Sequence, residues 1–195
     1  FADGLTDDVT AGLARFPYLR VVSRHDVEAV KGRAADAQSA ALVGARYLLD
    51  GTLRTAAGSA RLSVRLVDAG TGAHLWAETY DRPLASANVF DLQDDLTNRI
   101  VATVGDSDGV LVRSMAATVR ERPMEDLTLD EIVLRYYAFI QTFRPDEHLR
   151  LRAGFERALA ADPQHALGWG CLSDIYNMER AFGFNPLPDS SARAW

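Results

Sequence analysis

Three stretches with the composition of β-strands follow one another closely in the middle of the chain. We expect strands over 46–56, 61–67 and 74–81, separated by the turn-forming sequences Ala57-Gly58-Ser59 and Gly70-Thr71-Gly72. Links this short join antiparallel neighbours, because a parallel pair of strands needs a crossover of a dozen or more residues. The sequence therefore predicts an antiparallel meander of three strands.

The middle stretch alternates between polar and apolar residues over 61–66. A period of two is typical of a strand with one packed face and one wetter face. If Leu62, Val64 and Leu66 face helices, we expect four side chains to gather on the opposite face, where they can stack on a partner. These predicted partner-binding residues are Arg54, Arg65, Trp76 and Tyr80. The alternative is that they pair with one another across the strands, or are buried under the helix that follows residue 88.

Helical patterns and one more strand pattern surround the meander. A short β-branched run predicts a strand over 19–23. Helices are expected over 3–15, 36–44, 88–104 and 110–119. Together these patterns predict an α/β (α+β) domain over residues 1–122, with a mixed sheet that contains the meander.

The strand patterns end at the polar, proline-containing stretch 120–125, so we place a domain boundary between 122 and 123. Helices are expected over 129–142, 146–161 and 166–181. The large and small residues in this second domain, 123–195, have the spacing of tetratricopeptide-like repeats, in which large side chains fill the gap between antiparallel helices and a proline ends a helix. The predicted repeat-packing residues are Phe155, Ala158, Pro163, Trp169, Leu172 and Tyr176.

Several longer motifs, in register along nearly the whole chain, carry a family resemblance. They lie at 1–8, 16–24, 31–32, 46–54, 68–82 and 91–94. With the repeats, they resemble the TolB-like (FlgO-like) amino-terminal domain joined to tetratricopeptide repeats, an arrangement found downstream of bacterial class III adenylate or guanylate cyclase domains and of winged-helix transcriptional activators. Such domains usually open with an apolar strand, so the resemblance implies that a parent protein carries this strand before Phe1. We also expect the repeats to be truncated here.

Composition and motifs argue against several kinds of chemistry. The net charge of −6 disfavours a nucleic-acid binder, and no apolar run is long enough for a membrane span. The chain has neither a phosphate-binding loop nor a dinucleotide fingerprint, its four histidines are scattered, and its single cysteine has no nucleophile signature. Asp3, Asp7 and Asp8 are explained by the start of a helix. We therefore expect no cofactor, no metal site, no catalytic residue and a cytoplasmic location.

The resemblance favours a noncatalytic regulatory or protein-interaction region of a bacterial signalling protein, related to an adenylate or guanylate cyclase. Its expected partners are another protein or an upstream output domain of the same chain, with a homodimer as one possibility. One alternative is a small-ligand sensor of a transcriptional regulator, with its pocket at the sheet or near Pro123. The other is an enzyme in its own right.

Overall fold

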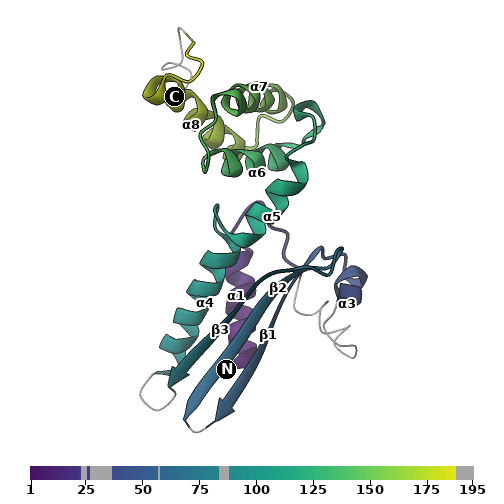
Figure 1. The fold of residues 1–195 in the computed structure, drawn as a ribbon, viewed down its shortest axis with the longest axis vertical. Helices are drawn as coiled ribbons and strands as arrows, with labels where there is room; N and C mark the ends of the chain where they lie inside the picture. The colour runs from purple at the N-terminus through teal and green to yellow at the C-terminus, as the bar shows by residue number, and fades with distance from the viewer. Residues whose placement is uncertain (23–25, 27–36, 57, 84–87, 188–195) are drawn as a thin grey trace. The chain divides into compact units, whose positions relative to one another are not determined.

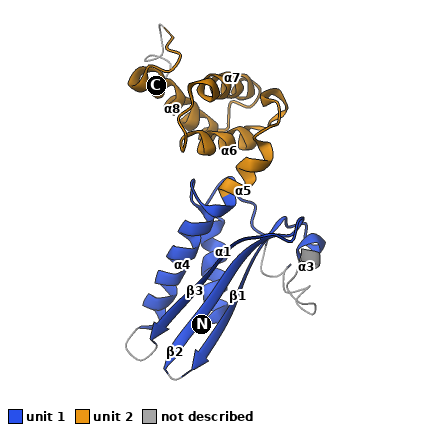
Figure 2. Ribbon diagram, viewed as in Figure 1, with its two compact units in different colours: residues 1–111 blue, residues 112–195 orange. Residues whose placement is uncertain are grey.

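The computed structural model describes residues 1–22, 26, 37–56, 58–83 and 88–187 (Figure 1). The chain forms two compact units, 1–111 and 112–195 (Figure 2). The division falls inside helix α5 (Val110–Val119). The predicted domain boundary between 122 and 123 lies later in the chain, and it stays a prediction.

The sheet of the first unit is the expected meander. Strands β1 (Tyr47–Ala56), β2 (Ser59–Asp68) and β3 (His74–Pro83) are antiparallel and lie in the order β1-β2-β3. Glycines with positive φ stand in both turns, Gly58 at 78° and Gly72 at 71°, where a side chain would strain the backbone. Among the described residues the sheet is entirely antiparallel, so the expectation of a mixed sheet finds no support in them.

Two helices that contact each other along their length cover one face of this sheet (Figure 1). They are α1 (Ala2–Leu13) and α4 (Val89–Gly105). Glycines allow the close approach: a Cβ added at Gly12 would lie 2.6 Å from Val101 Cγ2, and one at Gly105 would lie 2.7 Å from the Phe16 ring. Leu62, Val64 and Leu66 of β2, which alternate along the strand and so share a face, are buried.

The segments between α1 and β1 differ from expectation. Residues 19–22 form no strand, and the rest of the predicted strand lies outside the described residues. Tyr18 is instead fixed to the end of α4, since its hydroxyl donates to the Gly105 carbonyl at 2.6 Å. The expected helix at 36–44 appears as α3 (Ala37–Leu42), and Gly44 follows it with φ 68°. Residue 36, where the helix was expected to begin, lies outside the described residues.

The second unit is helical. It contains α6 (Leu129–Phe139), α7 (Pro145–Ala161) and α8 (Ala166–Phe182), preceded by a short 3-10 helix, η1 (Met124–Asp126). The three long helices all contact one another and enclose a core of fully buried side chains. This core includes Ile132, Phe139, Leu151, Phe155 and Ile175. The expected helices are thus present, while their assignment as tetratricopeptide repeats stays a prediction.

Candidate interaction surfaces

The sheet face away from α1 and α4 carries two cross-strand ion pairs. Arg65 donates to Asp50 Oδ2 from Nε at 2.9 Å and from Nη2 at 2.7 Å. Arg61 donates to Asp81 from Nε at 2.6 Å and from Nη2 at 3.0 Å. These hydrogen bonds lower the pKa of Asp81 and raise that of Arg61. Because the pairs are exposed, they contribute little to stability and mainly orient the charges that this face presents.

Arg54 is a cation on this face for which the described residues provide no partner. It is exposed and lies directly opposite Arg61 of β2, so two like charges face each other across the strands. Arg61 is satisfied by Asp81, whereas Arg54 has no hydrogen bond or ion pair with any part of the chain that the structure describes. Arg54 is therefore available to an anionic group of a partner.

Trp76 and Tyr80 lie on the opposite face, so the expectation that they share a face with Arg54 and Arg65 is wrong. Trp76 pairs with Leu66 and Tyr80 with Leu62, and residues directly opposite each other in antiparallel strands point to the same side. Tyr80 is only 6% exposed, and its hydroxyl donates to Glu78 at 3.1 Å. Burial, together with this hydrogen bond, raises the pKa of Tyr80 to about 12. Tyr80 is therefore buried on the helix side of the sheet, as the alternative to partner binding predicted.

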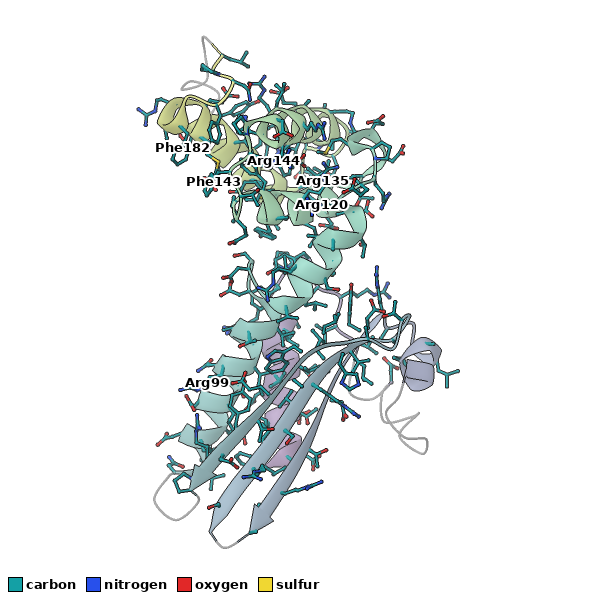
Figure 3. The ribbon with its side chains drawn as sticks, in the orientation of Figure 1. Arg99, Arg120, Arg135, Phe143, Arg144 and Phe182 are labelled. Atoms are coloured by element: carbon teal, nitrogen blue, oxygen red, sulfur yellow. The ribbon has the colours of Figure 1, made fainter. Side chains whose placement is uncertain are left out.

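A charged cluster that the sequence analysis missed joins β3 to α4. Asp95 accepts hydrogen bonds from Arg99 Nε at 2.8 Å and from Arg82 Nη2 at 3.1 Å. The bond from Arg99, then that from Arg82, lowers the pKa of Asp95. Arg99 is labelled on α4 in Figure 3. Asp95 and Arg99 are four residues apart on a helix, and this spacing could have predicted their ion pair. The hydrogen bond from Arg82 could not be predicted, because tertiary structure brings β3 beside α4.

The predicted repeat-packing residues differ in how deeply they are buried. Phe155, Leu172 and Tyr176 are buried, and the Tyr176 hydroxyl donates to Glu156 at 2.7 Å. Ala158 is half-buried and Pro163 is exposed in the turn that precedes α8. These positions agree with helix packing, although they do not test the repeat assignment.

Trp169 does not fill a gap between helices as expected. Its side chain is on the surface, with 48% of the residue exposed. The indole N–H donates to the Pro163 carbonyl at 3.0 Å, and this hydrogen bond holds the ring beside the turn between α7 and α8. The expectation of a buried aromatic at this position is wrong. The indole forms a hydrogen bond with the turn and is not packed in the core.

Two aromatic side chains form an exposed apolar patch on the helical unit. Phe143 and Phe182 are 42% and 57% exposed, and their ring centroids are 5.5 Å apart (Figure 3). Phe143 also has a φ of 50°, which is uncommon for a residue with a large side chain. This patch was not singled out in the sequence, since neither residue belongs to a recognisable pattern.

The second unit also contains a network that fastens the stretch before α6 to the helices. Arg135 is buried and donates from Nε to Glu147 at 2.9 Å and from Nη1 to the Arg122 carbonyl at 3.0 Å. Arg122 in turn pairs with Glu131 and donates to the Asp126 carbonyl at 2.9 Å. The network makes residues 122–126 part of the helical unit.

The described residues offer little for covalent or metal chemistry. They contain no group of three or more His, Cys, Asp or Glu side chains arranged to hold a metal ion. Burial raises the pKa of the Cys171 thiol to about 12, so the thiol stays protonated. Among these same residues, no helix combines the length and the apolar character that crossing a bilayer requires.

Comparison with known proteins gives one informative relationship. A protein of Rhizobium meliloti (strain 1021) named "Putative adenylate cyclase 3" is 32% identical to this chain over 180 residues. The match covers 90% of this chain. It covers 29% of the relative, so this chain spans less than a third of that protein's length. No protein-family model matches the chain. No solved structure matches it either.

Proposed function

We propose that this chain is a noncatalytic regulatory and protein-interaction region of a bacterial signalling protein related to adenylate cyclases. The observation that carries the proposal is the 32% identity to the Rhizobium meliloti protein along 90% of the chain. The match takes in both compact units, so we propose that they belong to the same regulatory region. The first corresponds to a TolB-like domain and the second to tetratricopeptide-like repeats.

The surfaces described above support an interaction role. The outer sheet face presents oriented charges, including an Arg54 without a partner in the described chain. The helical unit presents the exposed aromatic pair Phe143 and Phe182. Exposed charges on a rigid sheet and an exposed apolar patch are both features of surfaces that bind other proteins.

The proposed mechanism is a shift in population. A protein partner that binds one conformation of this region more tightly than another changes the balance between them. When the region is covalently joined to a cyclase domain, that balance biases the active and inactive states of the enzyme. We propose that this regulation takes place in the cytoplasm, where ATP is available to an adenylate cyclase.

A graft experiment tests the proposal. The matched segment of the Rhizobium meliloti protein is deleted in one variant and replaced by this chain in a second, and cyclic AMP production from ATP is compared with that of the intact protein. We expect the deletion to change the rate of cyclic AMP production and the graft to return it to that of the intact protein. The proposal is contradicted if the intact Rhizobium meliloti protein forms no cyclic AMP. It is also contradicted if neither the deletion nor the graft alters the rate.

A further inference from the structure

Residues 122–126 form a strap between α5 and α6 that is held against the helices largely through its backbone. The Arg122 carbonyl accepts a hydrogen bond from Arg135 Nη1 at 3.0 Å, and the Met124 carbonyl accepts one from Arg157 Nη2 at 2.8 Å. Arg135, labelled in Figure 3, belongs to α6, whereas Arg157 belongs to α7. The strap is therefore tied to both helices at once.

One side chain of the strap fits into a notch on α7. Gly154 is buried in this helix, and a Cβ added to it would lie 2.7 Å from both Cγ and Sδ of Met124. Atoms cannot approach this closely without displacing one another, so only a glycine at position 154 leaves room for the methionine in its present place. Met124 thus fixes the strap to α7 through its shape, in addition to the hydrogen bond that its carbonyl accepts.

The contacts of the strap are sparse compared with those of the helices that it touches. Pro123, Glu125 and Asp126 are exposed, and Met124 is only half-buried. The structure describes the whole strap, and none of its side chains is buried, whereas Phe155 of α7 is fully buried. Segments with few buried apolar contacts are the ones that open while the rest of a protein stays folded. The strap should therefore detach more readily than any of the three helices unfolds.

Detachment of the strap does not leave a buried charge without its partner. Arg135 keeps the hydrogen bond from Nε to Glu147 at 2.9 Å, because Glu147 belongs to α7 and stays in place. Arg157 is exposed, so water replaces the carbonyl of the strap at its guanidinium. The ion pair of Arg122 with Glu131 is accessible to water at both side chains, and its loss costs little.

From these contacts we infer that the strap is releasable, and that it opens as a unit while α6, α7 and α8 stay folded. The opening ends at Leu127, which is buried directly after the strap. When the strap is docked, the path of the chain from α5 to α6 is fixed, and when it is released, α5 can change its direction relative to α6. The proposed function requires a region with two conformations, and the docked and released strap supply them. Only this role in signalling rests on the proposed function, since the opening itself belongs to the chain alone and is measured without a cyclase.

Digestion of the full 195-residue chain by a glutamate-specific protease tests the inference. The protease cleaves a segment that has opened, so the rate of cleavage after Glu125 reports the population of the released strap. Glu156 of α7 is the internal reference, because cleavage there requires the helix to unfold. We expect cleavage after Glu125 to be about tenfold or more faster than cleavage after Glu156. Equal rates would show that the strap opens only when the helical unit unfolds, and would overturn the inference.

Two glycine substitutions test the notch. Gly154→Ala fills it, and we expect cleavage after Glu125 to become about tenfold faster while cleavage after Glu156 becomes no faster. Gly170→Ala is the matched control on α8, because a Cβ added there meets nothing within 4 Å and both changes raise the helix propensity alike. An unchanged rate after Glu125 in Gly154→Ala, or an equal rise at both cleavage sites, would contradict release from the notch.

A substitution at the surface carries the same test if Gly154→Ala does not fold. Arg157→Met removes the hydrogen bond to the Met124 carbonyl, and we expect cleavage after Glu125 to become about threefold or more faster. Arg144→Met, an equal change at an arginine that is paired elsewhere on the surface, should leave this rate at its native value. Equally fast cleavage of the strap in both arginine variants would overturn the inference. None of these rates depends on cyclase activity, so a failure of the proposed function would leave them unchanged.

Discussion

Arg152 and Glu179, on neighbouring helices of the second unit, form a buried ion pair. Glu179 is 1% exposed, and its carboxylate accepts a hydrogen bond from Arg152 Nη1. The same nitrogen donates to the Asn185 carbonyl at 2.9 Å, and Glu179 accepts from the Leu187 amide at 3.4 Å. The pair therefore ties α7 to α8 and to the segment that follows α8.

Removing Arg152 should be costly for the helical unit. Arg152→Met leaves a carboxylate buried without its cation, which typically costs about 3–5 kcal/mol. Urea unfolding followed by tryptophan fluorescence measures the change. Arg144→Met is the matched control, because Arg144 pairs with Asp146 at the surface and its loss should cost less than about 1 kcal/mol. Equal effects of the two substitutions would contradict a structural role for the buried pair.

The contact between α1 and α4 predicts a specific steric conflict. Gly12→Ala places a Cβ 2.6 Å from Val101 Cγ2, so the helices must separate or the valine must move. Overpacking of this kind typically costs about 1–3 kcal/mol, against a gain of about 1 kcal/mol in helix propensity. Val101→Ala removes the obstructing methyl groups.

The double variant should therefore lose less stability than the two single variants together. Thermal unfolding by circular dichroism provides the comparison. Strict additivity of the single effects would show that Gly12 and Val101 do not interact as described.

The start of α6 predicts a pH-dependent contribution to stability. Thr128 and Glu131 form a reciprocal capping box, and Glu131 also pairs with Arg122. Burial acts to raise the pKa of Glu131, but the Thr128 amide and Arg122 together lower it. A carboxyl with a lower pKa in the folded state stabilises the fold above its unfolded pKa, and this stabilisation is lost as the pH falls through the folded pKa.

Glu131→Gln keeps the hydrogen-bonding cap but removes the charge. Its free energy of unfolding should therefore fall less than that of the native chain as the pH is lowered from neutral through about 4. Glu125→Gln, at an exposed position of η1, should retain the native pH dependence. Parallel pH profiles for the native chain and Glu131→Gln would refute the prediction.

Cys171 should be inert in the folded protein. Burial raises the pKa of its thiol to about 12, so the reactive thiolate is scarce at neutral pH and reagents have little access. A chromogenic disulfide reagent should react slowly with the native chain and rapidly after unfolding in urea. Fast reaction of the native chain would point instead to an activated cysteine.

Local sequence patterns were sufficient for most of the elements. Short turns separate β1, β2 and β3, and the alternation in β2 identifies which of its faces is packed. The face of β3 could not be predicted, because Leu75, Trp76 and Ala77 are consecutive apolar residues and the register shifts beside them. Trp76 and Tyr80 were therefore assigned to the wrong side.

Interactions between elements lay beyond the sequence patterns. Residues 19–22 have the composition of a strand, but no described strand pairs with them. Arg152 and Glu179 stand 27 positions apart, and only the packing of α7 on α8 brings them together. Trp169 was expected between helices because its spacing matches that of a large repeat-packing residue, yet the nearby Pro163 carbonyl provides a surface partner for its N–H.

Cyclic AMP production by the purified 195-residue chain, supplied with ATP and Mg²⁺ or Mn²⁺, tests the noncatalytic assignment most directly. The chain alone should form no product above a protein-free control, while the full-length Rhizobium meliloti protein assayed in parallel should form it. Turnover by this chain alone would contradict the assignment and place a reactive centre within its own residues.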